Sequence, residues 1–450
     1  KLGMQSVVWN EAVKINGADP DFHRRDLWTA IRSGNFPEWE LGLQIFDEDF
    51  ANSLPFDVLD ATKLIPEEMV PVRIVGRLVL DRNPDNFFAE TEQVAFCPAN
   101  IVPGVDFSND PLLQGRLFSY LDTQKSRLGT ANFHQLPINA AKCPVMNFQR
   151  DGQMQMNVPK GRANYEPNSL SAHGEDGGPR ECPVTGFHTL ERSTGANEEG
   201  DKLRIRPELF ADHYSQARLF WTSQTPSEQA HIASSFVFEL SKVALEQVPP
   251  RMVANLLNVD EDLAKRVADG LGIDLPKKNP AARAPVDMEP SAALSIQKNM
   301  KDTLEGRKIG ILIADGSDAK ALKKLVGSIE KAGATAFLVA PKVGKVVLSD
   351  GKAIKADGQL AGSPSQIFDA VAIILSADAC KLMLREAAAI QFVMDAFGHL
   401  KAIGANGEAK ALLDKAGVEV DGGVVDLGDD FIAAAFKRYW DREPSVRTLA

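Results

Sequence analysis

The sequence is poor in cysteine, and its few cysteines lie far apart. Only four occur in 450 residues: Cys97, Cys143, Cys182 and Cys380. No Cys-x-x-Cys pair and no Cys/His ligand spacing is present, which argues against zinc and iron–sulfur sites. So low a cysteine content also argues against a disulfide scaffold. It indicates a reducing compartment, and we expect the protein to be cytoplasmic.

Long apolar runs and an excess of positive charge are absent as well. No stretch approaches the ~20 consecutive apolar residues of a membrane-spanning helix. The net charge is −11, whereas nucleic-acid binding needs a concentrated basic surface. We therefore expect neither a membrane nor a nucleic-acid partner, and a small neutral substrate suits the acidic balance. The chain opens Lys1-Leu2-Gly3 without an initiator Met or a signal peptide, so we expect it to come from a larger polypeptide.

The first half of the chain combines short elements with an irregular segment. Within residues 1–150, helical spacing predicts a helix over 21–31. Alternating apolar residues predict half-buried strands over 39–45 and 72–80. Such strands closed together would form a barrel rather than a parallel sheet. Residues 151–224 are rich in Asn, Gly and Pro, and we expect an extended arm that wraps over other surfaces.

The second half is more regular. Thr225-Pro226-Ser227-Glu228 predicts a helix start with a capping box, which opens a helical domain over residues 225–275. A proline-rich linker follows over 276–305. In residues 306–450, continuous apolar runs alternate with helical sequence, which predicts a doubly wound α/β domain. The fold class is therefore α+β, with a doubly wound α/β domain at its end.

One tyrosine carries a chemical signal. Tyr120 is one of four tyrosines, and a helix would place Arg116, Tyr120, Gln124 and Arg127 on one face. A phenol in water ionises near pH ~10, so a tyrosine ligates a metal at neutral pH only when the metal and a nearby cation favour the phenolate. Arg116 is placed to supply that cation. Taken alone, Arg-x-x-x-Tyr also fits an ordinary surface helix with a half-buried Tyr.

The match extends well beyond those four positions. Further segments share one family pattern, in order: Val75-Gly76-Arg77-Leu78-Val79-Leu80-Asp81-Arg82-Asn83-Pro84, Phe87-Phe88-Ala89-Glu90, Pro103-Gly104, Leu113-Gln114-Gly115-Arg116-Leu117-Phe118, Asn147-Phe148-Gln149-Arg150-Asp151-Gly152 and Asn164-Tyr165-x-Pro167-Asn168-Ser169. Residues 1 to about 300 resemble the second half of a haem catalase. Residues 306–450 resemble the extra flavodoxin-like domain of the large-subunit catalases. The resemblance implies the second half of an antiparallel β-barrel with a wrapping arm and a helical domain.

The resemblance also implies a function and a site. It implies a homotetramer that contains haem (haem b, or modified to haem d) and converts hydrogen peroxide to dioxygen and water. Carried over by motif, Tyr120 is the proximal iron ligand, and Arg116 hydrogen-bonds to its oxygen. Asp110 is expected to orient Arg116, and Arg127 to reach a haem propionate. The remaining expected cofactor contacts are Phe96, Leu112 and Gln124.

The sequence departs from that family in two places near the site. Some large-subunit catalases carry a His, 23 residues before the proximal Tyr, that becomes joined to it, and here that position is Cys97. A sulfur–tyrosine link is conceivable there, but a small buried hydrophobic side chain is the stronger expectation. Catalases that bind NADPH place a His in the segment that reads Leu64-Ile65-Pro66-Glu67-Glu68 here. Its acidic residues would repel the phosphates, so we expect no NADPH.

A third departure concerns catalysis. In the family, the distal His and Asn that cleave peroxide lie on the N-terminal half, and none of the seven histidines matches their motif. We therefore expect this chain alone to be inactive, and a non-catalytic haem-binding or structural fragment is the alternative. A cysteine hydrolase on residues 306–450 is a third hypothesis, because this fold is shared with class I glutamine amidotransferases, which place a nucleophilic Cys at a sharp turn after a strand. The equivalent turn here reads Ile403-Gly404-Ala405-Asn406-Gly407, without a thiol, which leaves only Cys380 and His399.

Overall fold

The protein is described from a computed structural model. It describes residues 7–101, 105–129, 132–140, 142, 151–153, 155, 158, 161–165, 168–169 and 207–446. The chain divides into two compact units. The first unit consists of Lys1–Gln44, Pro66–Leu80 and Asp212–Ala450, and the second unit of Ile45–Ile65 and Asp81–Ala211. Within the described ranges, no helix has the length and apolar character needed to cross a membrane.

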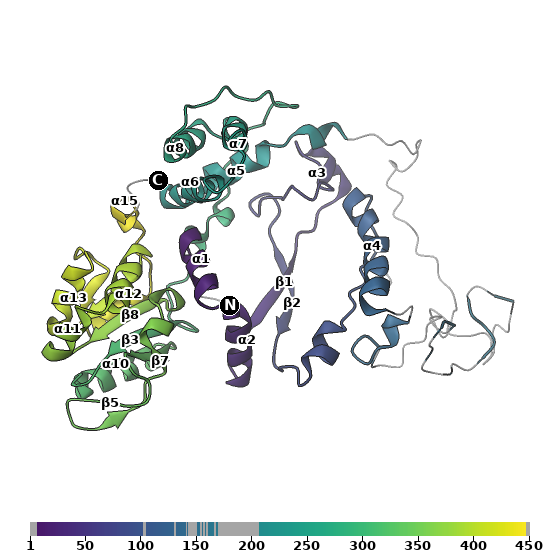
Figure 1. The fold of residues 1–450 in the computed structure, drawn as a ribbon. Coiled ribbons are helices and arrows are strands. Elements are labelled where there is room, and N and C mark those ends of the chain that lie inside the picture. Colours follow the sequence, from purple (N-terminus) through teal and green to yellow (C-terminus); the bar gives the residue numbers. More distant parts are fainter. Residues whose placement is uncertain are drawn as a thin grey trace. The chain divides into compact units, whose positions relative to one another are not determined.

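The first unit begins with two helices and two strands, of which the sequence predicts all but the first helix. They are α1 (Trp9–Ala18), α2 (Phe22–Arg32), β1 (Glu38–Leu43) and β2 (Arg73–Val79). The strands pair in antiparallel fashion, with Trp39 opposite Leu78, and the register shifts between Leu41 and Gly42. Figure 1 labels the two strands of this pair.

The expected barrel is represented among the described residues by these two strands alone. β1 and β2 form a two-stranded sheet of their own, and the apolar side chains along it are exposed. Leu41 is 58% exposed and Leu78 57%. The alternation thus predicts the strands correctly, but the expectation that they are half buried is wrong in this structure. The apolar face that would be buried in a closed barrel is open here.

The helical region contains α5 (Ser215–Ser223), α6 (Pro226–Leu240), α7 (Val248–Leu256) and α8 (Glu261–Leu271). The capping box predicted for α6 is present, because the Thr225 amide donates to Glu228 and the Glu228 amide donates to Thr225 Oγ1. Helix α5 corrects the expected extended arm, which otherwise falls mostly outside the described residues. It forms because Leu219 and Trp221 are buried and because Asp212 accepts from the amides that start the helix.

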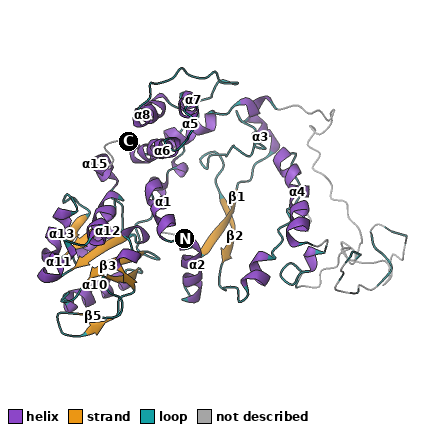
Figure 2. Cartoon of the chain, in the orientation of Figure 1, coloured by secondary structure: helices purple, strands orange, loops and turns teal. Residues whose placement is uncertain are grey.

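The α/β domain is a doubly wound parallel sheet in the order β10-β9-β8-β3-β4-β7, and Figure 2 shows its strands between helices. The bounds of the strands are β3 (Lys308–Ile313), β4 (Thr335–Ala340), β7 (Gly358–Gln359), β8 (Ala370–Ile374), β9 (Ile403–Ala405) and β10 (Val424–Asp426). All six are parallel. The sequence predicts β3, β4, β8 and β9. The short edge strands β7 and β10, and the antiparallel pair β5 (Val346–Val347) and β6 (Ala353–Ile354), give no apolar run to recognise.

Helices cover both faces of this sheet. One core cluster contains side chains of α11 (Ala377–Met383), α12 (Ala387–Gly398) and α13 (Lys410–Lys415), and the other contains side chains of α10 (Ala319–Lys331) and α14 (Asp429–Ala435). Strand residues such as Ile311 and Ile373 are fully buried. Each apolar run therefore becomes a strand enclosed on both sides, as expected for a parallel sheet.

Helix α1 is attached to the α/β domain by buried charges, and Figure 1 shows it next to that domain. The Glu11 carboxylate lies 2.8 Å from Lys401 Nζ and 2.7 Å from Arg438 Nη1, and the Glu11 and Lys401 side chains are fully buried. Burial by itself raises the pKa of Glu11, but Lys401 and Arg438 lower it to about 2. Burial lowers the pKa of His399, whose main-chain carbonyl accepts from Arg438, to about 4.

These two groups predict that the packing of α1 weakens in acid. An unfolded His binds a proton near pH 6.5 and an unfolded Glu near 4.5, whereas His399 and Glu11 in the folded protein resist protonation down to about 4 and about 2. Stability should therefore fall from pH 6.5 to 4 through His399, by up to about 3 kcal/mol. It should fall further from pH 4.5 to 2 through Glu11. The charged groups around His399 are Glu11, Lys401, Arg438, Lys14 and Asp395.

The measurement is the urea unfolding midpoint and the amide exchange of α1 at pH 7, 5.5, 4.5 and 3. His399→Gln should flatten the response between pH 6.5 and 4, while the Glu11 part below pH 4.5 remains. A His399→Gln protein with the same pH response as the unmodified chain would contradict this assignment.

Candidate functional site

The candidate site is built on α4 (Pro111–Leu128) in the second unit. Asp110 caps the helix, and its Oδ1 accepts from the Leu112 amide at 2.8 Å. Pro111 occupies the first turn, where a missing N–H costs nothing. The helix ends at Gly129, whose φ of 67° lies in the left-handed region. Arg116, Tyr120, Gln124 and Arg127 therefore share one continuous helix, as their spacing predicts.

Arg116 and Tyr120 are in direct contact. Arg116 Nη2 donates to Tyr120 Oη at 2.9 Å, and the guanidinium carbon lies 5.1 Å from the centre of the phenol ring. The ring of Phe96 meets the Tyr120 ring edge-on, with centroids 5.8 Å apart and planes at 73°. Tyr120 is half buried. The Tyr120 oxygen therefore accepts a charge-assisted hydrogen bond from a cation on its own helix.

Gln124 and Arg127 join α4 to the segment that carries Phe96. Gln124 is 5% exposed. Its Oε1 accepts from Arg127 Nε at 3.2 Å and Nη2 at 2.7 Å, and its Nε2 donates to the Phe96 carbonyl at 3.4 Å. Arg127 also donates to the carbonyls of Glu92 and Val94. Two side chains of α4 thus fix the main chain on both sides of residue 95.

Several sequence expectations are refined by these contacts. Asp110 caps α4 through Leu112, rather than orienting Arg116 as we expected. Phe96 is 62% exposed and Leu112 55%, so both present apolar surface on the second unit. Cys97 is a half-buried free thiol whose pKa is raised by burial, and it is not the fully buried side chain that we expected.

One further residue that shapes the site, Asn139, could not be predicted from the sequence. Asn139 Nδ2 donates to the carbonyls of Gln93 at 2.8 Å and Phe133 at 2.9 Å, and its Oδ1 accepts from the Ala95 amide at 2.8 Å. A single side chain therefore bonds the main chain at residues 93 and 95, whereas Arg127 bonds the carbonyls of residues 92 and 94. An Asn in an irregular stretch has no periodic signal, so only the structure reveals its role.

The described histidines have other surroundings. His23 contacts Phe22, His134 contacts Phe133, and His213 contacts Tyr214. The Nε2 of His231 lies 2.8 Å from Glu443, and His399 belongs to the cluster around Glu11. His173 and His188 lie outside the described residues, as do the motifs at Asn147–Gly152 in part. In the described part of the chain, no group of three or more His, Cys, Asp and Glu is placed to hold a metal ion.

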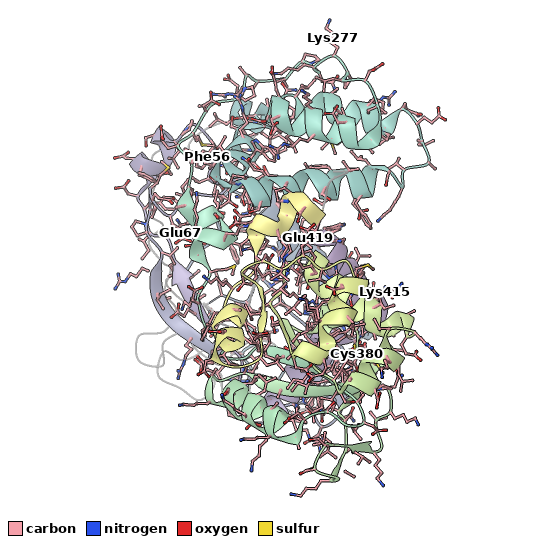
Figure 3. The ribbon with its side chains drawn as sticks, turned by 90° about the vertical axis from the view of Figure 1, so that its left-hand side faces the viewer. Phe56, Glu67, Lys277, Cys380, Lys415 and Glu419 are labelled. Atoms are coloured by element: carbon pink, nitrogen blue, oxygen red, sulfur yellow. The ribbon has the colours of Figure 1, made fainter. Side chains whose placement is uncertain are left out.

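The α/β domain does not present a reactive thiol among its described residues. Cys380 is 3% exposed within the core of α11, burial raises its pKa, and Figure 3 marks it among the packed helices. A thiol in such a place is a poor nucleophile. Asn406, at the turn where hydrolases of similar fold place their Cys, uses its side chain to bond both main-chain groups of Leu375.

At the position where this fold commonly binds ligands, the polar groups named below are hydrogen-bonded to the domain's own main chain. In an open parallel sheet, ligands bind at the carboxyl ends of the strands where the strand order reverses, which is between β3 and β8 here. Asp315 Oδ1 accepts from the Val347 amide at 2.8 Å, the Gly316 amide donates to the Val347 carbonyl at 2.7 Å, and Ser376 Oγ donates to the Asp315 carbonyl at 3.2 Å. The polar groups after β3 are thus used within the domain.

The segment expected to repel NADPH also has a structural contact. Glu68 Oε2 accepts from Ser291 Oγ at 2.6 Å, and Oε1 accepts from the Ala293 amide at 3.2 Å. These hydrogen bonds lower the pKa of Glu68, which keeps the carboxylate ionised. That NADPH does not bind remains a prediction.

A helix-borne Tyr–Arg pair followed by a doubly wound α/β domain is the arrangement expected of a long haem catalase, and comparisons with known proteins agree. Three family models match in order: Catalase over residues 1–172, Catalase-related immune-responsive over 207–271, and the C-terminal domain found in long catalases over 305–442. The chain belongs to the catalase family, and within it to the long, large-subunit type with a C-terminal flavodoxin-like domain.

Individual relatives are similar over nearly the whole chain. It is 56% identical to Catalase C of Rhizobium meliloti, over 99% of this chain. It is 44% identical to Catalase HPII of Pseudomonas aeruginosa, over 100% of this chain, and 42% identical to Catalase-2 of Bacillus subtilis, over 98%. In each case the chain spans 64% of the relative's length.

The contacts of Arg127 predict a local effect of its removal. Arg127→Met would leave the buried Gln124 Oε1 and two main-chain carbonyls without this donor, a loss of roughly 1–3 kcal/mol. Amide exchange over residues 92–96 should accelerate about tenfold or more. Lys125→Met, on the exposed side of the same helix, is the matched control. Unchanged exchange in Arg127→Met would mean that the Arg127 contacts do not hold this segment.

Proposed function

We propose that this protein functions as a haem catalase, which disproportionates hydrogen peroxide to dioxygen and water, with Tyr120 as the proximal haem ligand. The observation that carries the proposal is the 2.9 Å hydrogen bond from Arg116 Nη2 to Tyr120 Oη on α4. Membership of the long catalase family supports it independently. Haem b and a modified haem d both suit this site.

The residues present fit a haem. The Tyr120 oxygen is an anionic donor once deprotonated, and the Arg116 guanidinium stabilises that form. Phe96, Leu112 and Phe118 are 55–70% exposed, which suits contact with a large apolar ring. A guanidinium has five N–H donors. Arg127 makes four hydrogen bonds through them, to two carbonyls and to Gln124, so one N–H remains for a propionate.

Each residue has a separate task in this proposal. The haem, when bound, supplies the redox chemistry. Tyr120 holds the iron through its phenolate oxygen, and Arg116 keeps a hydrogen bond on that oxygen, which limits how much charge it donates. The Phe96 edge limits rotation of the Tyr120 ring. Gln124 and Arg127 keep Phe96 in place through the main chain of residues 92–96.

The remaining assignments are part of the same proposal. We propose a cytoplasmic homotetramer that binds no NADPH. We propose a domain division at residues 1–150, 151–224, 225–275, 276–305 and 306–450. The α/β domain is assigned a structural role, because its switch-point groups and Cys380 are used internally. A non-catalytic haem-binding or structural fragment is the second candidate, supported by the lack of a distal His–Asn motif in this sequence.

The ligand assignment is tested by Tyr120→Phe. Removing the oxygen should abolish stable haem binding, or remove the charge-transfer bands of a phenolate-bound ferric iron, while the far-UV circular dichroism is kept. Arg116→Lys is the companion variant. It retains the charge but loses the planar fork, so haem should bind with shifted bands. In a catalytically complete version of the protein, activity should also fall substantially while the fold is retained. Normal haem content and spectrum in Tyr120→Phe would refute the assignment.

The activity of this chain alone is a separate prediction. Peroxide cleavage needs a distal general base, which contributes about 10²–10⁴-fold in rate, and no His here matches that role by motif. The 450-residue chain, supplied with haem, should therefore release oxygen from peroxide far more slowly than its full-length relatives. Oxygen-electrode measurements on a pure, monodisperse sample would test this. Rapid, haem-dependent oxygen release would overturn it and would point to a distal base among the seven histidines.

A further inference from the structure

The attachment of α1 to the α/β domain resembles ligand binding more than helix packing. Glu11 is the one buried residue within α1, while Trp9 is 48% exposed and Val13 43%. Two more side chains of the helix make polar contacts: Trp9 donates an exposed hydrogen bond to Glu239, and Lys14 forms an ion pair with Asp395. An amphipathic helix normally buries an apolar stripe. Here the helix inserts a carboxylate instead.

The α/β domain holds the receiving cations by its own main chain. Lys401 Nζ donates to the carbonyls of Ser365 at 2.7 Å, Gln366 at 3.1 Å and Phe368 at 2.5 Å. Arg438 Nη1 donates to the His399 carbonyl at 3.1 Å. None of these acceptors belongs to α1. The two cations are therefore positioned whether or not the helix is docked.

The geometry at Glu11 matches a carboxylate on both oxygens. Arg438 contacts Oε2 through Nη1 at 2.7 Å and Oε1 through Nη2 at 3.2 Å, and Lys401 Nζ lies 2.8 Å from Oε1. A guanidinium fork plus an ammonium recognises a planar, bidentate anion. The Lys401 and Arg438 side chains are almost completely buried, so removing the Glu11 carboxylate would take one counter-charge away from two buried cations.

Two further buried polar atoms belong to residues that contact the cations. Ser365 Oγ and His399 Nδ1 are buried and make no hydrogen bond in the structure. The main-chain carbonyls of these residues accept from Lys401 and Arg438, respectively. Buried polar atoms without partners are rare and call for an explanation, and a site that takes a small oxyanion would explain them.

We propose that Lys401 and Arg438 form a carboxylate receptor of the α/β domain, which Glu11 of α1 fills in the folded chain. The receptor takes a small free monocarboxylate when the Glu11 side chain is removed. Its role in this protein is to retain α1, and so the α/β domain acts as a clamp on a helix that is distant from it in sequence. This inference does not depend on haem or on peroxide chemistry.

The test is chemical rescue in the full 450-residue chain. Glu11→Ala removes a CH₂–COO⁻ group, which acetate replaces atom for atom. Amide protection over Trp9–Ala18, measured by hydrogen exchange, should fall on the order of 100-fold in Glu11→Ala, because two buried cations lose their counter-charge. Acetate, but not chloride at equal ionic strength, should restore most of that protection and raise Tm in a saturable manner. The unmodified chain should not respond to acetate, since a tethered carboxylate outcompetes a free one.

Three control variants make the result specific. Glu11→Gln loses the charge but fills the space, so acetate should have no effect. Lys14→Ala breaks the other ion pair of α1 and leaves the receptor filled, so acetate should not help. In Glu11→Ala/Arg438→Met, the rescue by acetate should disappear.

Each outcome decides the proposal. Equal responses to acetate and chloride, rescue of Glu11→Gln, or α1 protection unchanged in Glu11→Ala would overturn it. Should Glu11→Ala fail to fold in chloride buffer, refolding is carried out in acetate and in chloride side by side. Recovery in acetate alone supports the receptor, and failure in both buffers counts against it.

Discussion

The buried ion triad of Glu11, Lys401 and Arg438 is the contact on which the first unit depends most. It joins residue 11 to residues 401 and 438, so one buried carboxylate of the first helix contacts two cations of the last domain. Removing charges from water costs several kcal/mol for each ion, and this cost is offset only by close geometry and additional hydrogen bonds. The carbonyls around Lys401 and the fork of Arg438 supply both. The triad therefore makes this contact specific for residue 11 of α1. An apolar patch of equal area would not require one particular residue at that position.

The second unit depends on a different constraint, which is the period of the α-helix. Residues four apart on α4 lie one above the other, and this spacing alone brings Arg116 to the Tyr120 oxygen. Further along the same helix, Gln124 and Arg127 donate hydrogen bonds to main-chain carbonyls of residues 92–96. The phenol is thus supported by one helix and one neighbouring segment. Proton and charge chemistry at such a site needs this kind of fixed support.

Local patterns explain how much could be predicted from the sequence. The strands β1, β2, β3 and β4, the capping box of α6 and the Arg116–Tyr120 contact all follow from periods of two or 3.6, or from short-range capping rules. The partner of Glu11 could not be predicted, because a lone Glu in a short helix carries no sign of cations almost 400 positions away. Asn139 and the capping role of Asp110 likewise depend on which amide lies nearest in space. Helix α5 was missed because its Asn-, Gly- and Pro-rich neighbours suggested an irregular arm.

The same comparison clarifies the division of roles within the chain. The α/β domain has the fold in which ligands commonly bind at a strand-order reversal, yet Asp315, Gly316 and Ser376 there are bonded to the domain's own main chain. Cys380 is enclosed in the core. What this domain offers to the rest of its unit is the cation pair that holds α1. At α4, by contrast, Leu112 of the helix and Phe96 of the neighbouring segment remain exposed, and the Tyr120 phenol has a hydrogen-bonded cation. Fold resemblance alone would assign chemistry to either the α/β domain or α4. The polar groups of the α/β domain named above are bonded within that domain, whereas α4 has groups available for a cofactor.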